Sequence, residues 1–390
     1  MVFIGTNVYI PFFFRKSMNI LVVNAGSSSV KYCVFSFPEE KVITQGMIEK
    51  IGEKKSKIPT HQKALLAMFK KIKEVISLKK IDAVGHRIVH GGPLIYQPTL
   101  LTKQVIRKLH TFDDLAPLHN PYNLLGVILC EKYLHCPHIG VFDTGFHHDL
   151  PEKSKTYAIP YQYLKKIRRY GFHGISHEYV ALEASHILQK PLSSLRFITC
   201  HLGNGASLCA IKNGKSVDTS MGFTPLEGLV MGTRCGDIDP DIVAYLIEKE
   251  HLSRKEVFHI LEKKSGLKGL AGVNDMRDLL AHIKKGNSRA KLAFDAFCYR
   301  IIKYLGAYLA VLGGADGIIF TAGIGEHAPL VRHEVLSAFH FLGIVLDPKK
   351  NQKNEVLISK ASSTIPVFVI PTNEALMIAM KTKEFLLKKK

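Results

Sequence analysis

Two stretches of the chain repeat one pattern, an apolar strand, a short polar turn and a second strand, and this repeat constrains the fold most. In the first copy, a turn of Asn, Gly and Ser residues at 24–29 lies inside the β-rich stretch 20–35. In the second copy, a similar turn at 203–207 lies inside the stretch 197–211. Each copy predicts a β-hairpin. A duplicated unit of this kind predicts two related domains with a cleft between them.

The first turn has side chains and backbone groups that can hold phosphate oxygens. Gly26 lets the backbone approach a ligand closely, the three serines at 27–29 supply donors, and Lys31 adds a positive charge. Such a turn can cradle a phosphate, although it lacks the Gly-Lys-Ser/Thr ending of a Walker loop. A Ser-rich surface turn is the alternative interpretation.

The charge of the chain is strongly positive, with 53 Lys and Arg against 33 Asp and Glu and a formal net charge of +20. A field of this sign attracts anionic substrates as well as nucleic acid. The lysines are scattered, and aromatic residues do not alternate with them as they do in single-strand-binding platforms. We therefore expect general basicity and no specific nucleic-acid site.

The cysteines and the first residues bear on the cellular compartment. Seven cysteines without paired spacing argue against a disulfide framework and suit a reducing cytoplasm. In residues 1–17 the positive charges follow the apolar run, which is the wrong order for a signal peptide, and the run is too short to span a bilayer. We expect a cytoplasmic protein with no membrane association and an N-terminal extension, residues 1–17, of unknown role.

Three charged side chains stand at or just after the ends of predicted strands, where α/β sheets collect functional groups. They are Arg87, Asp143 and Glu374. The planar fork of Arg87 suits a carboxylate or a phosphate, with a structural ion pair as the alternative. Asp143 could act as a base, a positioning group or a metal partner, or it could cap the next element.

A pair of histidines, His173 and His177, has the spacing that places two zinc ligands on one face of a helix. The metalloprotease glutamate is missing, however, because Gly174 follows His173. We therefore expect His173, close to Arg168 and Arg169, to contact an anion instead.

Two Gly-rich segments in the second half also suggest function. The long segment 221–240 predicts an irregular loop in which four glycines surround Arg234, and long loops usually exist for function. Residues 317–327 predict a strand, a Gly-rich turn and a helix, which could seat a nucleotide on the helix start.

Taken in order, these motifs resemble the acetate kinase family, in the superfamily shared with sugar kinases, actin and the heat-shock ATPases. The resemblance runs from about Met18 to Lys383. The family transfers the γ-phosphoryl group of ATP reversibly to acetate, giving acetyl phosphate and ADP. The motifs that carry the resemblance are Asn24-Ala-Gly-Ser-Ser-Ser, His86-Arg-Ile-Val-His-Gly-Gly, Ala116-Pro-Leu-His-Asn-Pro, Phe142-Asp-Thr, Tyr170-Gly-Phe-His-Gly-Ile-Ser-His, His201-Leu-Gly-Asn-Gly, Met231-Gly-Thr-Arg, Gly236-Asp-Ile-Asp-Pro and Thr321-Ala-Gly-Ile-Gly-Glu.

The resemblance implies an α/β fold of two duplicated ribonuclease-H-like (actin-like ATPase) domains with a central cleft. One domain would comprise 18–147 plus 376–390, and the other 148–375. The resemblance also implies a homodimer, a Mg²⁺ cofactor with Mn²⁺ as an alternative, and ATP or ADP as co-substrate.

The same resemblance implies a role for each matching residue. The catalytic residues would be Asp143, His173 and Arg234, and the residues that bind acetate or acetyl phosphate would be Arg87 and His119. The metal ligands would be Asn24 and Glu374. The nucleotide-binding residues would be Lys31, His201, Leu202, Gly203, Asn204, Gly205, Asp275, Met276, Arg277, Gly323, Ile324, Gly325, Glu326 and His327. The chain departs from the usual family pattern at Gly145, Cys235, Met276, His327 and Ala375, none of which removes a charged catalytic group.

Other functions remain open at this point. A kinase for propionate or butyrate would share the chemistry and differ in pocket size, since one methylene changes discrimination by only ~1–3 kcal/mol. A more distant alternative is an actin-like or chaperone-like ATPase with a conformational output. Arg87 and Arg234 argue against it, because simple ATP hydrolysis needs no carboxylate clamp.

Overall fold

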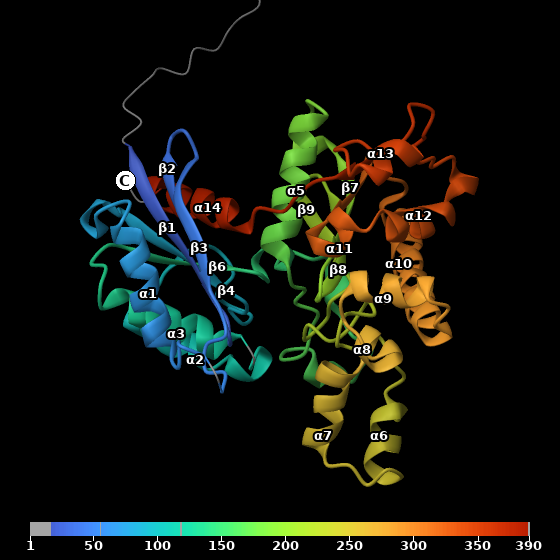
Figure 1. The fold of residues 1–390 in the computed structure, drawn as a ribbon, viewed down its shortest axis with the longest axis horizontal. Helices are drawn as coiled ribbons and strands as arrows, with labels where there is room; N and C mark the ends of the chain where they lie inside the picture. Colours follow the sequence, from blue (N-terminus) through green and yellow to red (C-terminus); the bar gives the residue numbers. More distant parts are fainter. Residues whose placement is uncertain (1–16, 55, 118, 389–390) are drawn as a thin grey trace, which may run out of the picture.

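The computed structural model describes residues 17–54, 56–117 and 119–388, so most of the predicted extension 1–17 lies outside the described residues. The chain forms two β-sheets with helices on their faces (Figure 1). The N-terminal sheet has the strand order β3-β2-β1-β4-β6-β5 and the C-terminal sheet the order β11-β10-β7-β8-β9. The strands of the first are β1 (Met18–Ala25), β2 (Val30–Phe37), β3 (Lys41–Ile48), β4 (Ala83–Ile88), β5 (Thr99–Leu100) and β6 (His138–Phe142). Those of the second are β7 (Arg196–Leu202), β8 (Ala206–Lys212), β9 (Lys215–Thr219), β10 (Gly317–Thr321) and β11 (Val367–Val369).

Both predicted hairpins are confirmed, and they occupy corresponding places. β1 pairs antiparallel with β2, and β7 pairs antiparallel with β8. Each hairpin is followed by a third antiparallel strand, since β2 pairs with β3 and β8 pairs with β9, and each of these two pairings contains a register shift. On its other side each leading strand pairs with a parallel strand, β1 with β4 and β7 with β10. The repeated topology is the duplicated α/β fold that the sequence predicted.

The alternation of side chains along β1 explains how the N-terminal sheet is covered on both faces. Leu21 and Val23 pack with residues of α1 (His61–Lys73), whereas Ile20 and Val22 face the opposite way and pack with residues of α14 (Glu374–Lys388). The last helix therefore completes the first sheet. Gly85 lies in the neighbouring strand β4, and a side chain at this position would meet Thr382 and Ile378 of α14. β4 therefore needs a glycine where the helix crosses it.

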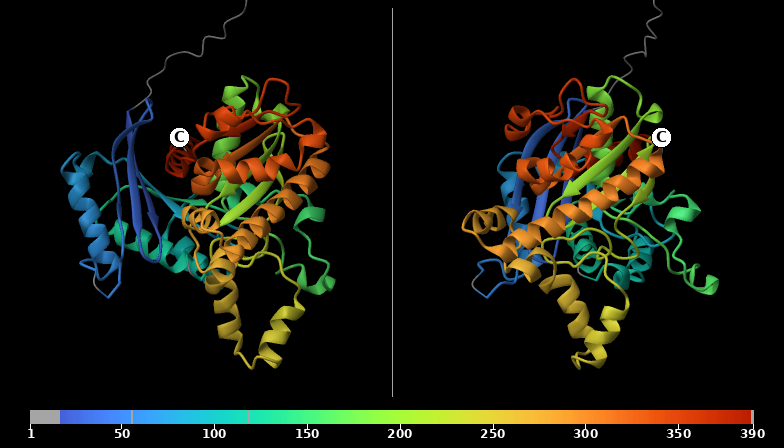
Figure 2. Two further views of the ribbon diagram at one scale, coloured as in Figure 1. Left: turned by 45° about the vertical axis from the view of Figure 1, so that its right-hand side comes forward. Right: turned by 90° about the vertical axis from the view of Figure 1, so that its right-hand side faces the viewer.

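The C-terminal sheet lies between α5 (Gly174–Ile187) and α10 (Ser288–Leu312), and Figure 2 shows α10 across one of its faces. The α5 side of this sheet shares one hydrophobic core with α14 and the N-terminal sheet. That core joins the two halves behind the cleft. The hairpin of α6 (Asp241–Glu248) and α7 (Arg254–His259) projects away from the sheets (Figures 1 and 2).

The remaining helices connect or cover these units. They are α2 (Lys103–His110), α3 (Asn120–Glu131), α4 (Glu152–Lys155), α8 (Gly266–Ala271), α9 (Met276–Lys284), α11 (Ala322–His327), α12 (Pro329–Ser337), α13 (Pro348–Gln352), a π-helical turn Ile260–Lys264, and short 3-10 turns at Leu78–Lys80, Asp113–Leu115, Gly145–His147, Tyr161–Tyr163, Leu192–Ser194 and His340–Leu342. Among the described helices, none combines the length and apolar character that a bilayer span needs.

Candidate active site

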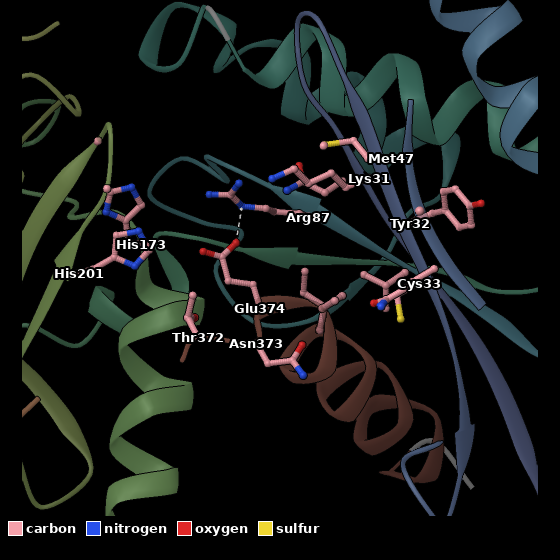
Figure 3. Close-up of a pocket in the computed structure, with 18 of the residues that line it drawn as sticks. Lys31, Tyr32, Cys33, Met47, Arg87, His173, His201, Thr372, Asn373 and Glu374 are labelled. Atoms are coloured by element: carbon pink, nitrogen blue, oxygen red, sulfur yellow. Dashed lines mark ion pairs between the residues drawn. The ribbon is translucent and has the colours of Figure 1, made fainter. Parts of the chain in front are cut away.

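A cavity of about 720 Å³ lies between the two sheets and collects residues from distant parts of the sequence (Figure 3). The N-terminal sheet contributes Asn24, Lys31 and Arg87, and the other half contributes His173, His201 and the turn between β7 and β8. Glu374, the first residue of α14, reaches into the cavity from the segment that connects the halves. The predicted central cleft is therefore present.

Arg87 is the most constrained charge in this cavity. It lies in β4 beside the parallel strand β6, after which Asp143 follows, so strand pairing brings the two side chains together. Arg87 Nε donates to Asp143 Oδ1 at 3.0 Å and Nη2 to Oδ2 at 2.5 Å, while Glu374 lies 3.6 Å from Nε. Burial disfavours the charge, but the two carboxylates outweigh it and raise the pKa of Arg87. The guanidinium therefore stays cationic.

His173 and His201 form a stacked pair with ring centroids 4.1 Å apart, visible in Figure 3. His173 lies in the left-handed backbone region, with φ of 57°, immediately before α5. Burial lowers the pKa of both rings, that of His201 to about 4. Both imidazoles are therefore neutral at physiological pH.

Arg234 reaches the same region from the irregular loop at 220–240. A Cβ atom built on Gly205 would lie 3.3 Å from Arg234 Nη1 and 3.5 Å from His173 Nε2, so both side chains flank this glycine. Burial lowers the pKa of Arg234, and its polar contact is to Met231 Sδ at 3.9 Å. Among the described residues it forms no ion pair. Arg234 is half-buried, and the charge of Glu262 opposes the lowering of its pKa without forming an ion pair. A partly desolvated cation that has no ion pair suits an anionic ligand.

A second cavity, of about 460 Å³, is lined by Arg234 and His119 among other residues. Its other lining includes Phe223 and Pro225, so it is partly apolar. Burial lowers the pKa of His119 to about 4, and the charges of Arg234 and Arg87 add to the effect. This cavity has the mixed character that a short acyl chain with a carboxylate end requires.

A third cavity, of about 520 Å³, joins three separate sequence segments, all of which the sequence assigned to the nucleotide. It shares Gly203 and Asn204 with the central cavity, so the two are neighbours. Asp275 caps α9 and holds the exposed Arg277 through Nε at 3.0 Å and Nη2 at 2.6 Å. The other predicted residues that line this cavity are Met276, Gly323, Ile324 and His327.

Three of the predicted nucleotide residues do not line these cavities. Leu202 is fully buried, and Gly325 lies against the backbone of the C-terminal sheet. Glu326 folds back, and its Oε1 accepts hydrogen bonds from the N–H groups of Ala322 at 2.8 Å and Thr372 at 3.2 Å. The start of α11 is thus capped by the chain's own carboxylate, and the expected Gly-rich turn is part of this helix.

The sequence analysis gave no role to a set of buried polar residues behind His173. His177 and Ser207 are buried, and Ser207 Oγ lies within hydrogen-bond distance of both His173 and His177. The spacing of the two histidines was the available signal. That spacing was interpreted only as a possible zinc site, whereas in the structure the Ser207 hydroxyl lies between the two rings.

Comparisons with known proteins give one family. The sequence model described as the Acetokinase family matches residues 19–380. An acetate kinase of Dictyoglomus thermophilum is 50% identical over 392 residues, which cover 94% of this chain and 98% of that protein. The crystal structure of Porphyromonas gingivalis acetate kinase has a TM-score of 0.89 at 43% identity and covers 95% of this chain and 100% of that one. A propionate kinase from Francisella tularensis also has a TM-score of 0.89, at 39% identity, with 93% of this chain and 98% of that one covered.

Proposed function

Because the chain belongs to the acetokinase family, we propose that its central cavity transfers the γ-phosphoryl group of ATP to acetate in a magnesium-dependent reaction. The protein is a phosphotransferase with a carboxylate acceptor and has the acetate kinase activity of that family. The observation that carries the assignment of the site is that Arg87 and His173 line the central cavity, while Arg234 lies beside Gly205 of the same cavity.

Arg87 is the group that would hold the acetate carboxylate. Its Nε and Nη2 already face Asp143, which leaves Nη1 for the substrate. Asp143 is then a positioning acid, because it fixes the plane of the guanidinium. Acetate is already ionised, so no base is needed to activate it. His119, in the neighbouring partly apolar cavity, would lie near the methyl group.

Arg234 and His173 would meet the oxygens of the phosphoryl group as it moves. A carboxylate oxygen of acetate attacks the γ-phosphorus in line. The bond from this phosphorus to the bridging oxygen breaks, ADP keeps that oxygen, and acetyl phosphate forms. Catalysis of such a transfer consists mainly of alignment and charge neutralisation. Arg87 and the neutral His173 in the central cavity, with Arg234 beside Gly205, can supply both.

The third cavity would take the nucleoside part of ATP, and the shared turn at Gly203 and Asn204 would carry the phosphates toward the central cavity. Lys31 and His201 would contact the phosphates from the lining of the central cavity. In this arrangement the reacting phosphoryl group would lie between the two halves of the chain.

The residues present fit a magnesium ion. Mg²⁺ prefers oxygen ligands, keeps several waters and often shares one or two carboxylates with substrate phosphates. Asn24 and Glu374 offer an amide oxygen and a carboxylate on the cavity wall. Within the described residues no group of three or more His, Cys, Asp and Glu side chains could hold a metal ion by itself. When bound, the ion would neutralise the phosphate charge.

We further propose the division into domains 18–147 plus 376–390 and 148–375, with closure of the cleft on ATP. The packing of α14 on the N-terminal sheet supports this division. Closure would exclude water and protect ATP from hydrolysis. Scattering profiles with and without nucleotide test it, and identical profiles would count against it.

A homodimer in the cytoplasm completes the proposal. The helix α6 is rich in apolar residues yet contains none that is buried, and Tyr245 is 57% exposed. A second copy could cover such a helix. All seven cysteines are free, which suits a reducing compartment. Sedimentation should give a dimer, and Tyr245→Lys should weaken it.

A panel of acyl acceptors with ATP and magnesium tests the function. We expect acetyl phosphate with the highest kcat/KM on acetate, and lower values on propionate and butyrate. Propionate is the second candidate, because the Francisella tularensis propionate kinase has the same TM-score as the acetate kinase structure. No acyl phosphate from any acceptor would contradict the proposal.

A further inference from the structure

The two ring nitrogens of His173 face different surroundings. Nδ1 lies 2.9 Å from the hydroxyl of Ser207. Nε2 lies on the side of Gly205, where a built Cβ would be 3.5 Å away, and the ring lines the central cavity (Figure 3). A neutral imidazole carries its single proton on one nitrogen or the other. The choice decides whether the cavity meets an N–H donor or a lone pair.

Ser207 connects His173 to a second histidine. Its hydroxyl is fully buried and also lies 2.8 Å from His177 Nε2. Burial lowers the pKa of both histidines well below the ordinary value, so both rings are neutral. A hydroxyl has one proton, and among the described residues the two rings are the hydrogen-bond partners of the Ser207 hydroxyl. Ser207 therefore donates to one ring and accepts from the other. Two directions are therefore possible, and they give opposite forms of His173.

Thr199 sets the direction. Its hydroxyl, also fully buried, is 2.7 Å from His177 Nδ1 and 3.5 Å from the carbonyl of Cys209. If Thr199 accepted from His177, its own proton would have only the Cys209 carbonyl at 3.5 Å, which is at the limit of a hydrogen bond. Thr199 therefore donates through the short contact to His177 Nδ1. His177 must then carry its proton on Nε2 and donate to Ser207. Ser207 in turn donates to His173 Nδ1, which leaves the proton of His173 on Nε2.

We propose that Thr199, His177 and Ser207 form a directed hydrogen-bond relay that holds His173 with its proton on Nε2, ready to donate to a phosphoryl oxygen. The proposal rests on the proposed function, in which His173 meets the moving phosphoryl group. The opposite direction would present a lone pair to a negatively charged oxygen. Thr199, His177 and Ser207 are positioning residues, because they act through His173.

A matched pair of variants at Thr199 tests the relay in the full-length enzyme. Thr199→Val keeps the shape and removes the hydroxyl, whereas Thr199→Ser keeps the hydroxyl. Proton–nitrogen NMR of histidine-labelled protein reports the tautomer of His173, and its signal is assigned by its loss in His173→Gln. We expect wild type and Thr199→Ser to show the proton on Nε2, and Thr199→Val to show a mixture.

The kinetics should follow the tautomer. Thr199→Val should lower kcat about fivefold to tenfold, the usual effect of one lost hydrogen bond, with the KM values for ATP and acetate changed less than about twofold, since binding contacts are untouched. Ser216→Ala is the control. It removes a buried serine–histidine bond of 2.8 Å, to His147, that is not part of the relay, and it should leave the tautomer of His173 unchanged.

Three results would overturn the proposal: a proton on Nδ1 of His173 in the wild-type enzyme, an unchanged tautomer in Thr199→Val, or unchanged turnover in that variant. The wild-type spectrum decides even if the variant fails to fold. Failure of the proposed function is distinguishable, because it would leave the His173 signal as expected while no acyl phosphate forms.

Discussion

The substitution Arg87→Lys separates the geometry of the acetate site from its charge. Arg87 holds Asp143 through two nitrogens and has the third free for the substrate carboxylate. Lysine keeps the positive charge but has a single ammonium group. It therefore cannot make two parallel hydrogen bonds to Asp143 and at the same time bind the carboxylate of acetate. Because a partner for Asp143 remains, the variant should still fold.

The expected loss follows from the number of contacts. A hydrogen bond to a charged group contributes ~1.5–3 kcal/mol, and Arg87→Lys removes at least one such bond from the substrate or from Asp143. The corresponding loss in kcat/KM for acetate is roughly 10- to 150-fold. The KM for ATP should change less than about twofold, since the cavity proposed for the nucleoside part of ATP does not include Arg87.

The chain contains a matched control for this experiment. Arg277 makes the same kind of fork with Asp275, at 3.0 and 2.6 Å, but on the nucleotide cavity. Arg277→Lys should therefore alter the KM for ATP and leave the KM for acetate unchanged. Initial rates with each substrate varied at saturation of the other measure both. The reasoning is refuted if Arg87→Lys keeps kcat/KM for acetate within about threefold of wild type, or if it raises both KM values equally.

Four further predictions concern other parts of the molecule. Arg234→Ala should lower turnover about a hundred- to a thousand-fold, ~3–4 kcal/mol, with little effect on ATP binding in a nucleotide titration; near-normal turnover would contradict its role. Gly232→Ala should raise the KM for ATP, because the new Cβ would overlap Asn204 Oδ1, and an unchanged KM would show that the turn can shift freely. Burial lowers the pKa of His147 from 6.5 to about 4, so between these pH values the unfolded chain binds more protons than the folded one. As the pH is lowered from 6.5 to 4, this residue should therefore reduce the free energy of unfolding by up to ~1.4 kcal/mol per pH unit. Urea denaturation of wild type and His147→Gln measures this slope, and equal slopes would count against it. Glu374→Gln should raise the magnesium concentration needed for half-maximal activity after treatment with a chelator, and an unaltered magnesium dependence would remove this residue from the metal site.

The sequence predicted the strands and hairpins well because their signals are local. The apolar runs that flank residues 24–29 and 203–207 each fix a hairpin, and both sheets grow from these hairpins by the same topology. Functional groups at strand ends were also predictable, since parallel strands such as β4 and β6 bring Arg87 and Asp143 to one edge.

Other features depended on contacts that no local pattern contains. The fork between Arg87 and Asp143 joins residues 56 positions apart, and the sequence left an ion pair and an anion site as alternatives. The structure has the ion pair inside the cavity that we propose as the anion site. The relay behind His173 was missed for a similar reason, because Ser207 comes from a strand and His177 from a helix. Only tertiary packing places them together.

The position of α14 has a consequence for how the protein is made. Ribosomes deliver the N-terminal sheet first, yet Ile20 and Val22 of β1 are covered by the last helix of the chain. Until residue 388 leaves the exit tunnel, one apolar surface of the earliest domain stays open to solvent and to chaperones. Truncations that remove α14 would therefore damage the part of the protein that was translated earliest.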